Sequence, residues 1–403
     1  MRKLKLFAFL LAIVASVGMS WAETVDLATV TSDRTFQNGD ILQGTLSSKA
    51  KLSIAAGATI TLNGVNINWG GSLAGGDFAG LNCLGNATIV LADGSVNYVK
   101  GFMDGPAGIH IAPNYTVTIS GNGTLNVATK GGGAAIGSGY SDSGGSRNGG
   151  NIVINGGTIY ANGGNLGAGI GGGGRAKVGN ITINGGIIYA VGGGTGAGIG
   201  GGQSKSSSWK SQVGNITISS NVKYLKATKG SGAAHSIGLG SSSYSVCGTV
   251  TIPGGATGYV STNPYVYCNP DYVIELINAI PQPVVYTEEC KAAIDEARAM
   301  YTALTNDQKT SVTNYSTLTD AEAAYAALPV EDKIAAIGTV EYTAECKAKI
   351  DAARTAYDAL SDEAKALVTN YSTLTDAETA YAALNQAEAD KVVAKINAIP
   401  QPV

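Results

Sequence analysis

Four short segments before residue 220 alternate apolar and polar residues. They read VTIS at 117–120, IVIN at 152–155, ITIN at 181–184 and ITIS at 216–219. Strict alternation places every second side chain on one face, which is typical of a β-strand with one buried side. The pattern therefore predicts four strands whose isoleucines and valines face a common core.

The spacing of these strands predicts how they are arranged. Their first residues stand 35, 29 and 35 positions apart, and no helical pattern lies between them. Each strand is therefore expected to return and lie parallel on the previous one. LSIAAGATITLNGVNI from Leu52 and ATIVLADGS from Ala87 look like earlier passes of the same kind. Since parallel crossovers are right-handed, the sequence predicts a right-handed parallel β-helix over residues 23–270.

Three inward columns follow from this register. One contains Ile154, Ile183 and Ile218, the second Leu125, Ile159 and Ile188, and the third Ile136, Ile170, Ile199 and Ile237. The third column runs through GAAIGSG at 133–139, GAGIGGG at 167–173 and 196–202, and SIGLG at 236–240. GAGIGGG satisfies the GxGxxG pattern of a nucleotide-binding loop, but it recurs after 29 residues and no helix-forming run follows it. We therefore expect its glycines to form a tight corner of each pass.

The period changes to helical after Asp271. The segment from Thr287 recurs from Thr343, each residue displaced by 56, and in each copy a cysteine, an isoleucine, an alanine, a tyrosine and a leucine step by four, three, four and three. This is the buried stripe of an amphipathic helix, so Cys290 and Cys346 are expected in the core. Thr319 with Glu322, and Thr375 with Glu378, have capping-box spacing and predict that a new helix begins there. The sequence thus predicts tandem three-helix bundles, 271–338 and 339–403, the second including the start of a truncated third.

Composition supports a division near residue 270. Residues 23–270 hold eight acidic and 13 basic residues, whereas residues 271–403 hold 21 acidic and 10 basic residues. At the amino terminus, Arg2, Lys3 and Lys5 precede an apolar run and Ser20-Trp21-Ala22, which is typical of a secretory signal peptide over residues 1–22. We therefore expect a secreted or cell-surface protein. Among five cysteines, only Cys247 and Cys268 form a plausible pair, as a clasp on the last pass.

The phrases FQNGDILQGTL, ATITLNGVNI and ATIVLADGS, together with the GAGIGGG passes, resemble the secreted bacterial carbohydrate-binding β-helix proteins related to the pectate-lyase superfamily. The resemblance covers residues 25 to about 260. It implies an exported protein that adheres to polysaccharide, often acidic. The helical half is similar to the tandem helical repeats of bacterial surface proteins, which act as stalks or as ligand-binding modules, and here we favour a stalk.

Insertions after the glycine motifs are the candidate binding residues. In a stack of passes they emerge on one edge, and that edge is often the one that binds. Aromatic faces stack on sugar rings, while arginine and lysine pair with carboxylates. Solvated loops without a ligand explain the same composition equally well. The candidate residues are Tyr140, Arg147, Arg175, Lys177, Lys205, Trp209, Lys210 and Tyr244.

Two alternatives concern other residues of the same half. Tyr160 and Tyr189 occupy matched, outward positions, where ordinary cross-strand packing is favoured over a sugar platform. Catalysis by a lyase or hydrolase needs clustered carboxylates, but the aspartates from Asp26 to Asp142 are scattered singly, and His110 and His235 have no partner in sequence. Convergence of Asp77 and Asp104 from different passes stays open, so an enzyme is the less favoured hypothesis.

The expected partner is a polysaccharide, with a host or bacterial surface as the alternative. No cofactor is expected, although calcium bridging Asp142 to a uronate stays possible in principle. The modest positive charge and the signal peptide argue against nucleic acid, and no later segment is long and apolar enough to cross a bilayer. Finally, INAIPQPV at 396–403 repeats residues 277–284, which favours a longer protein with further repeats and a surface anchor.

Overall fold

The computed structural model describes residues 22–68, 78–101, 105–141, 147–241 and 244–399. It divides into two compact units, Met1–Asn269 and Pro270–Val403. We call them the β unit and the helical unit, and describe each by itself. The predicted signal peptide lies outside the described residues except for Ala22.

The β unit consists of three sheets, which are parallel at nearly every pairing. Its largest sheet has 15 strands in two rows that meet at β5 (Thr59–Ile67). The first row contains β7 (Ala87–Leu91), β10 (Thr116–Gly121), β13 (Asn151–Ile154), β17 (Ile181–Ile183), β21 (Ile216–Ile218) and β25 (Val250–Thr251). The second row contains β8 (Val96–Lys100), β11 (Thr124–Ala128), β14 (Thr158–Asn162), β18 (Ile187–Val191), β22 (Tyr224–Thr228) and the antiparallel β26 (Tyr265–Cys268). β1 (Thr24–Asp26) and β3 (Ile41–Thr45) complete this sheet, and a 3-10 turn, η1 (Leu27–Thr29), follows β1.

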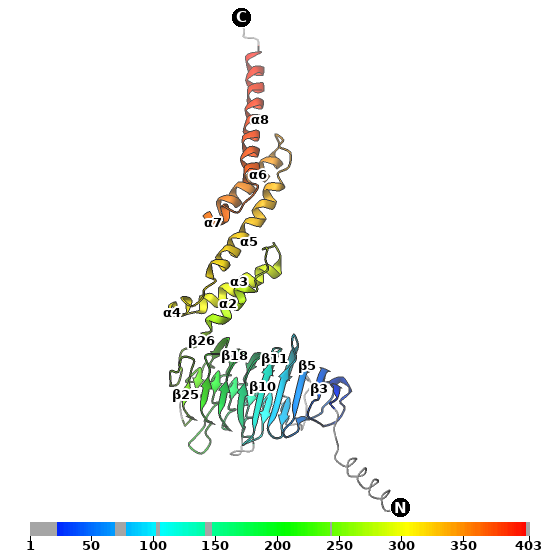
Figure 1. Ribbon diagram of the computed structural model, residues 1–403, viewed down its shortest axis with the longest axis vertical. Helices are drawn as coiled ribbons and strands as arrows, with labels where there is room; N and C mark the ends of the chain where they lie inside the picture. Colours follow the sequence, from blue (N-terminus) through cyan, green and yellow to red (C-terminus); the bar gives the residue numbers. More distant parts are fainter. Residues whose placement is uncertain (1–21, 69–77, 102–104, 142–146, 242–243, 400–403) are drawn as a thin grey trace, which may run out of the picture. The chain divides into compact units, whose positions relative to one another are not determined.

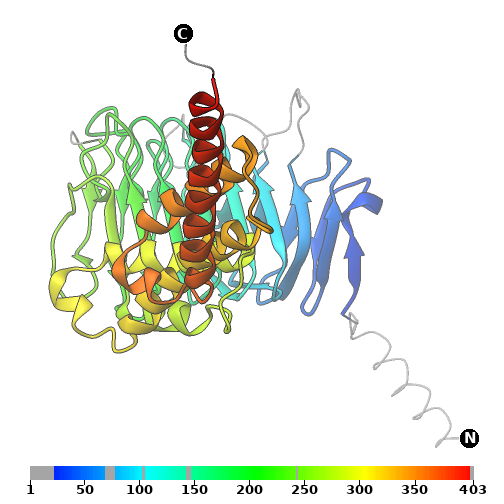
Figure 2. The ribbon, with the colours of Figure 1, turned by 90° about the horizontal axis from the view of Figure 1, so that it is seen from above.

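The other two sheets are built from shorter strands. The eight-stranded sheet contains β2 (Arg34–Phe36), β4 (Leu52–Ile54), β6 (Leu81–Cys83), β9 (Ile109–Ile111), β12 (Ile136–Gly137), β15 (Ile170–Gly171), β19 (Ile199–Gly200) and β23 (Ile237–Gly238). The three-stranded sheet contains β16 (Lys177–Val178), β20 (Gln212–Val213) and β24 (Val246–Cys247). Strands follow one another along the length of the β unit in sequence order, from blue to green, in both views (Figure 1 and Figure 2).

The predicted stacking of strands is confirmed at residue level. Val117 lies opposite Ile152, Ile152 opposite Ile181, and Ile181 opposite Ile216, each in a parallel pair. The second and third columns are in register too, since Leu125 pairs with Ile159 and Ile170 with Ile199. Each pass of the chain therefore places its apolar residues directly on those of the previous pass.

These columns form the core of the β unit. The isoleucines predicted to face inward are buried, with exposed fractions of 0–2%. Burial of one such side chain stabilises a fold by roughly 1.5–3 kcal/mol relative to full exposure. Since the columns belong to one continuous apolar cluster from Val25 to Val250, the core extends through all of the passes.

The glycine motifs differ from the prediction of a corner. Ile170–Gly171 and Ile199–Gly200 are short parallel strands of the eight-stranded sheet. Gly171 has a φ of +134°, and a Cβ atom built on it would stand 2.1 Å from the carbonyl oxygen of Gly200. Glycine is needed there for both its backbone conformation and the close approach of the next pass. The motif thus contributes a strand to the eight-stranded sheet and is not only a turn.

The expected clasp between Cys247 and Cys268 is wrong. Cys247 ends β24 in the three-stranded sheet, whereas Cys268 ends β26 at the edge of the large sheet, and both carry thiols. Burial raises the pKa of each thiol to about 12. The last pass is instead covered by hydrogen-bonded strand β26, which runs antiparallel to β22.

The helical unit contains seven helices in its described part (Figure 1). They are α2 (Pro270–Asn278), α3 (Glu288–Ala303), α4 (Asn306–Lys309), α5 (Tyr315–Ala335), α6 (Ala344–Asp358), α7 (Asp362–Lys365) and α8 (Tyr371–Asn397). None of the helices in the described ranges has the length and apolar character of a segment that crosses a membrane.

The predicted helical stripe is confirmed in its central part. Cys290, Ile294 and Ala297 are buried in α3, as are the matching Cys346, Ile350 and Ala353 in α6. The second core also contains Val330 and Ile334 from the end of α5, together with Leu374 from the start of α8. Helix α5 therefore supplies residues to two successive bundles, since its earlier residues Leu318 and Ala321 are buried as well.

The predicted capping boxes at Thr319 and Thr375 are wrong. Helices α5 and α8 begin four residues earlier, at Tyr315 and Tyr371, so both threonines lie inside a helix. The glutamate of each supposed box is engaged elsewhere, because Glu322 accepts hydrogen bonds from Arg298 and Glu378 accepts them from Arg354. The capping box that does form joins Thr305 and Gln308 at α4.

The Arg354–Glu378 ion pair joins α6 to α8. The Nε and Nη2 atoms of Arg354 each donate to one carboxylate oxygen of Glu378, at 2.7 Å. The guanidinium lies 5.6 Å from the ring centre of Tyr357 and 5.4 Å from that of Tyr371, which stack on each other. These hydrogen bonds lower the pKa of Glu378 below its ordinary value.

Gly171→Ala is expected to destabilise the β unit more than Gly254→Ala. Both glycines have positive φ, but nothing lies within 4 Å of a Cβ built on Gly254, whereas Gly171 faces the Gly200 carbonyl. The extra cost of overpacking is about 1–3 kcal/mol. Urea unfolding of the two variants measures the difference, and equal midpoints would contradict the stacking of passes through these glycines.

Acid is expected to remove the contribution of the Arg354–Glu378 pair. A depressed carboxyl pKa adds stability that is fully present above its ordinary value and is lost as pH falls through the folded-state value. Glu378→Gln should therefore lower the melting temperature at about pH 7 and have much less effect at about pH 3. Circular dichroism measures both transitions, and a deficit of equal size at the two pH values would refute the role of the carboxylate charge.

Candidate functional site

Three of the predicted insertions come together beside the eight-stranded sheet. Tyr140 follows β12, Arg175 lies between β15 and β16, and Trp209 lies between β19 and β20. Because Ile136, Ile170 and Ile199 are stacked in register, the loops that follow them leave the sheet one above another. The predicted gathering of these side chains on one edge therefore follows from the register of the core.

The side chains form a column that alternates aromatic rings and cations. The guanidinium carbon of Arg175 lies 5.0 Å from the ring centre of Tyr140 and 5.3 Å from that of Trp209. The ammonium nitrogen of Lys205 lies 5.8 Å from the Trp209 ring centre. All three distances are within the range of cation–π attraction. We call this set the Tyr140–Arg175–Trp209 column.

Backbone and serine hydrogen bonds hold the column in place. The amide of Arg175 donates to the carbonyl of Gln203 at 2.7 Å, and the amide of Lys205 donates to the carbonyl of Trp209 at 2.9 Å. Ser204 is buried, and its hydroxyl accepts from the amide of Ser211 at 2.8 Å. These bonds fasten both ends of the loop that carries Trp209 to buried groups.

The aromatic rings of the column contact cations. Arg175 lies over the rings of Tyr140 and Trp209, and Lys205 lies over the Trp209 ring as well. Trp209 is nevertheless 38% exposed, and Lys205 is exposed. An arginine guanidinium carries N–H groups that match the geometry of a carboxylate.

The other predicted residues lie around this column. Arg147 turns toward the backbone, its Nη1 donating to the carbonyl of Tyr140 at 3.1 Å, and burial lowers its pKa. Lys177 is exposed on β16, Lys210 shortly precedes β20, and Tyr244 is exposed before β24. These three lie on neighbouring segments rather than in the column itself.

Charge is distributed unevenly in the β unit. Its acidic residues within the described ranges are Glu23, Asp26, Asp33, Asp40 and Asp93, all in the first passes. Arg175, Lys177, Lys205 and Lys210 belong to later passes, where the described residues before Asp271 include no carboxylate side chain. Within the described residues, the cations of the edge and the carboxylates thus lie in different passes of the β unit.

Sequence analysis did not predict a small hollow whose lining includes Gly139, the residue before Tyr140. Its volume is about 270 Å³, and Lys51, Asn82, His110 and Arg147 are among its lining residues. His110 Nδ1 lies 2.9 Å from the side-chain oxygen Oδ1 of Asn82, and Nε2 lies 3.1 Å from the backbone carbonyl oxygen of Asn148. Burial, and secondarily Lys51, lower the His110 pKa. Since both ring nitrogens have partners, His110 is held as a structural residue, as the sequence suggested.

Tyr160 and Tyr189 pack on each other as expected. Their ring centres are 4.7 Å apart and their planes differ by 6°. In this geometry each ring covers one face of the other, and the Tyr189 ring also contacts the Tyr224 ring at 5.3 Å between centres. Tyr98 continues the row two strands away, since Asn126 pairs with both Tyr98 and Tyr160, and it is 47% exposed.

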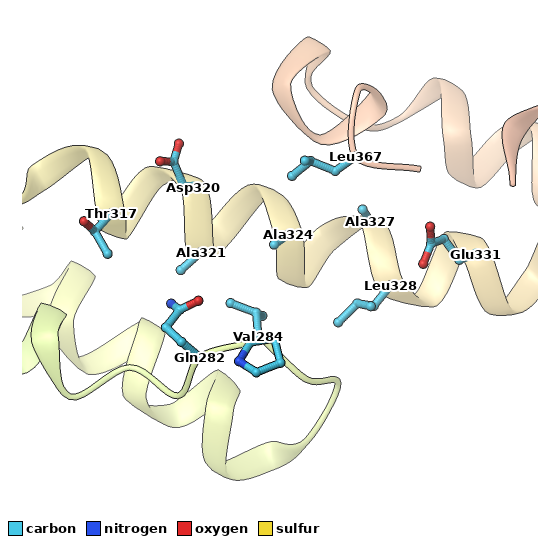
Figure 3. A pocket seen from close by; sticks show the side chains of 11 residues that line it. Gln282, Val284, Thr317, Asp320, Ala321, Ala324, Ala327, Leu328, Glu331 and Leu367 are labelled. Carbon is cyan, nitrogen blue, oxygen red and sulfur yellow. The ribbon is translucent and has the colours of Figure 1, made fainter. Parts of the chain in front are cut away.

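A hollow of about 620 Å³ in the helical unit lies between the segment Gln282–Val284 and α5. Figure 3 shows the side chains of Gln282 and Val284 facing Ala321 and Ala324 of α5, with Leu367 on the far side. Apart from Asp320 and Glu331 its lining carries no charge. The alanine spacing along α5 is the only signal of it in the sequence.

The described residues give no direct indication of metal or acid–base chemistry. No group of three or more histidine, cysteine, aspartate or glutamate side chains in the described ranges is arranged to hold a metal ion. Asp77, Asp104 and Asp142, which the sequence raised for catalysis and for calcium, lie outside the described residues.

Comparison with known proteins identifies no relative. The chain matches no protein-family model, no curated protein and no solved structure.

Arg175→Ala is expected to expose Trp209 and weaken its loop. Loss of a surface cation–π contact costs about 0.5–1 kcal/mol for each ring. In protein that begins at Glu23 and carries Trp69→Phe, so that Trp209 is its one tryptophan, acrylamide should quench the fluorescence more strongly after Arg175→Ala, while Lys226→Ala on β22 should have no effect. Unchanged quenching by both substitutions would contradict the column.

Proposed function

We propose that this protein is an exported, non-catalytic polysaccharide-binding protein, whose ligand is an acidic glycan. The single observation that carries the proposal is Arg175 held between Tyr140 and Trp209, 5.0 and 5.3 Å from their ring centres. Uronate carboxylates recur along acidic glycans at intervals, and a row of fixed cations on stacked passes can bind several at once.

The fold that we propose for the β unit is a right-handed parallel β-helix. Its support is the order of the strands, because each pass contributes to both rows of the large sheet and to the eight-stranded sheet before the next pass begins. Parallel crossovers of this kind are right-handed in nearly all proteins. A ligand that lies along the helix axis would then meet Tyr140, Arg175 and Trp209 in turn.

The helical unit acts in this proposal as an acidic spacer of tandem three-helix bundles. Support comes from the shared helix α5, which joins one core to the next without a flexible linker. Display of the β unit on such a spacer agrees with a secreted or cell-surface location, which the signal-like amino terminus suggests. No cofactor is needed for binding of this kind.

The occupation of the ring faces by cations favours an acidic over a neutral glycan. A neutral sugar would have to stack on an aromatic face, but those of Tyr140 and Trp209 contact Arg175 and Lys205. An adhesin that binds an acidic surface component is the second candidate, since the same cations would serve it.

Affinity electrophoresis through gels that contain polygalacturonate, xylan or a neutral glucan tests the proposal. We expect polygalacturonate alone to retard the protein, the retardation to fall with added salt, and no unsaturated product to appear. Arg175→Ala together with Trp209→Ala should abolish the retardation.

The matched control is Tyr98→Ala together with Lys100→Ala, which also removes one aromatic ring and one cation, but from β8. This control should be retarded as strongly as the unmodified protein. Loss of retardation in the control alone would place the ligand on the tyrosine row, and retardation by neutral glucan alone would refute the acidic-glycan proposal. Release of unsaturated product would show an enzyme instead.

A further inference from the structure

One apolar segment occurs three times in the helical unit. It reads YVIELINAI at 272–280, PVEDKIAAI at 329–337 and KVVAKINAI at 391–399. A valine and two isoleucines occupy matching places, four and then three residues apart, which puts them on one face of a helix. The segments form α2, the end of α5 and the end of α8, continued by one residue pair beyond each helix.

The first two copies are buried and the third is exposed. Val273, Ile277 and Ile280 have exposed fractions of 0, 1 and 3%, and Val330, Ile334 and Ile337 have 3, 0 and 4%. The third copy differs completely, because Val392, Ile396 and Ile399 are 55, 57 and 60% exposed. The adjacent Val393 is 54% exposed, so α8 ends in an open apolar face.

The structure shows what covers this face in the earlier copies. Val330, Ile334 and Ile337 share a core with Cys346, Ile350 and Ala353 of α6. In the first bundle, α2 packs on α3, whose Cys290, Ile294 and Ala297 are equally buried. The partner is therefore the same kind of helix each time, one that carries the cysteine–isoleucine–alanine stripe.

A second contact between successive repeats is a hydrogen bond, and the residue that accepts it has a counterpart at the end of α8. The side-chain amide of Asn314 donates to the Asn278 side-chain oxygen at 2.9 Å and to the Ile274 carbonyl at 3.1 Å. In the next bundle, Asn370 donates likewise to the Glu331 carbonyl at 2.9 Å. Asn397 stands in the third segment where Asn278 stands in the first, so it offers the same acceptor.

Charge fits the same partner. Lys395 lies beside the exposed face of α8, whereas the first turn of α3 is acidic, with Glu288 and Glu289. The segment Gln282–Val284, which leads the chain from α2 toward α3 along α5 (Figure 3), has the same letters as residues 401–403. The sequence that connects α2 to α3 in the first bundle thus also follows the third segment.

We propose that the Val392–Ile399 face of α8 is a docking surface for a helix of the α3 type. The occupant is the cysteine–isoleucine–alanine stripe of a further copy of this repeat, which would pack on α8 as α6 packs on the end of α5. α8 would then serve two successive cores, as α5 does. The inference is independent of the proposed function of the β unit.

The test extends the full chain by a copy of residues 285–338 placed directly after Val403. Hydrogen exchange of residues 389–399 is compared between the extended and the unextended protein. We expect exchange of these amides to slow by about tenfold or more, because they would join a packed core instead of an open helix end.

Two variants of the extended protein serve as matched controls. One carries Ile294→Glu in the appended copy only, and the other carries Ile396→Glu in α8; neither alters the two existing cores. Both should lose the added protection. The proposal is overturned if the extension gives no protection, if either control keeps it, or if the unextended protein shows protection that rises with concentration, which would mean pairing with a second chain.

Discussion

The register between successive passes of the chain is the constraint on which the β unit depends. Ile170 lies opposite Ile199 in a parallel pair, and the glycine after each approaches the carbonyl of the next pass too closely for any side chain. A slip by one residue would turn every inward isoleucine to the outside. The glycines also prevent such a slip, because other residues of the pass cannot occupy their position.

The same register places the candidate site. Tyr140, Arg175 and Trp209 are about 35 residues apart in sequence, yet their loops begin at equivalent points of three passes. Solenoids in general use a stacked core to carry variable loops on one edge. In this protein two of the loops place their aromatic rings against one guanidinium, that of Arg175.

In the helical unit, neighbouring cores are connected because they share a helix. Each bundle buries the end of one helix against the next α3-type helix, so that the cores of neighbouring bundles are joined through α5. Arg298 and Arg354 repeat the same bidentate contact with a glutamate in each bundle. The repeated sequence thus makes repeated contacts. The copy of the apolar segment at the end of α8 is informative because it lacks the contact that the two earlier copies make.

Much of the fold follows from periodicity. The alternation in IVIN and ITIN predicts both the strands and their inward isoleucines, and the four–three spacing around Cys290 predicts the buried face of α3. Local motifs were less reliable: Thr319 and Glu322 fit a capping box, but Glu322 binds Arg298, a contact between helices that spacing along the chain does not reveal.

Two further differences have the same origin. The Cys247–Cys268 clasp failed because neighbouring passes place the two residues in different sheets. For the site, the sequence identified the residues of the edge but not that Arg175 would cover the rings, since side-chain contacts between loops depend on the backbone of both. The hollow beside His110 likewise joins residues from Lys51 to Arg147, which no local pattern connects.

Hydrogen exchange of the β unit with and without polygalacturonate tests the central claim most directly. The account predicts slower exchange in the segments 139–141, 174–178 and 203–211, with the amides of β8, β11 and β14 unchanged. Slower exchange confined to those strands, or no change anywhere at saturating polysaccharide, would contradict it.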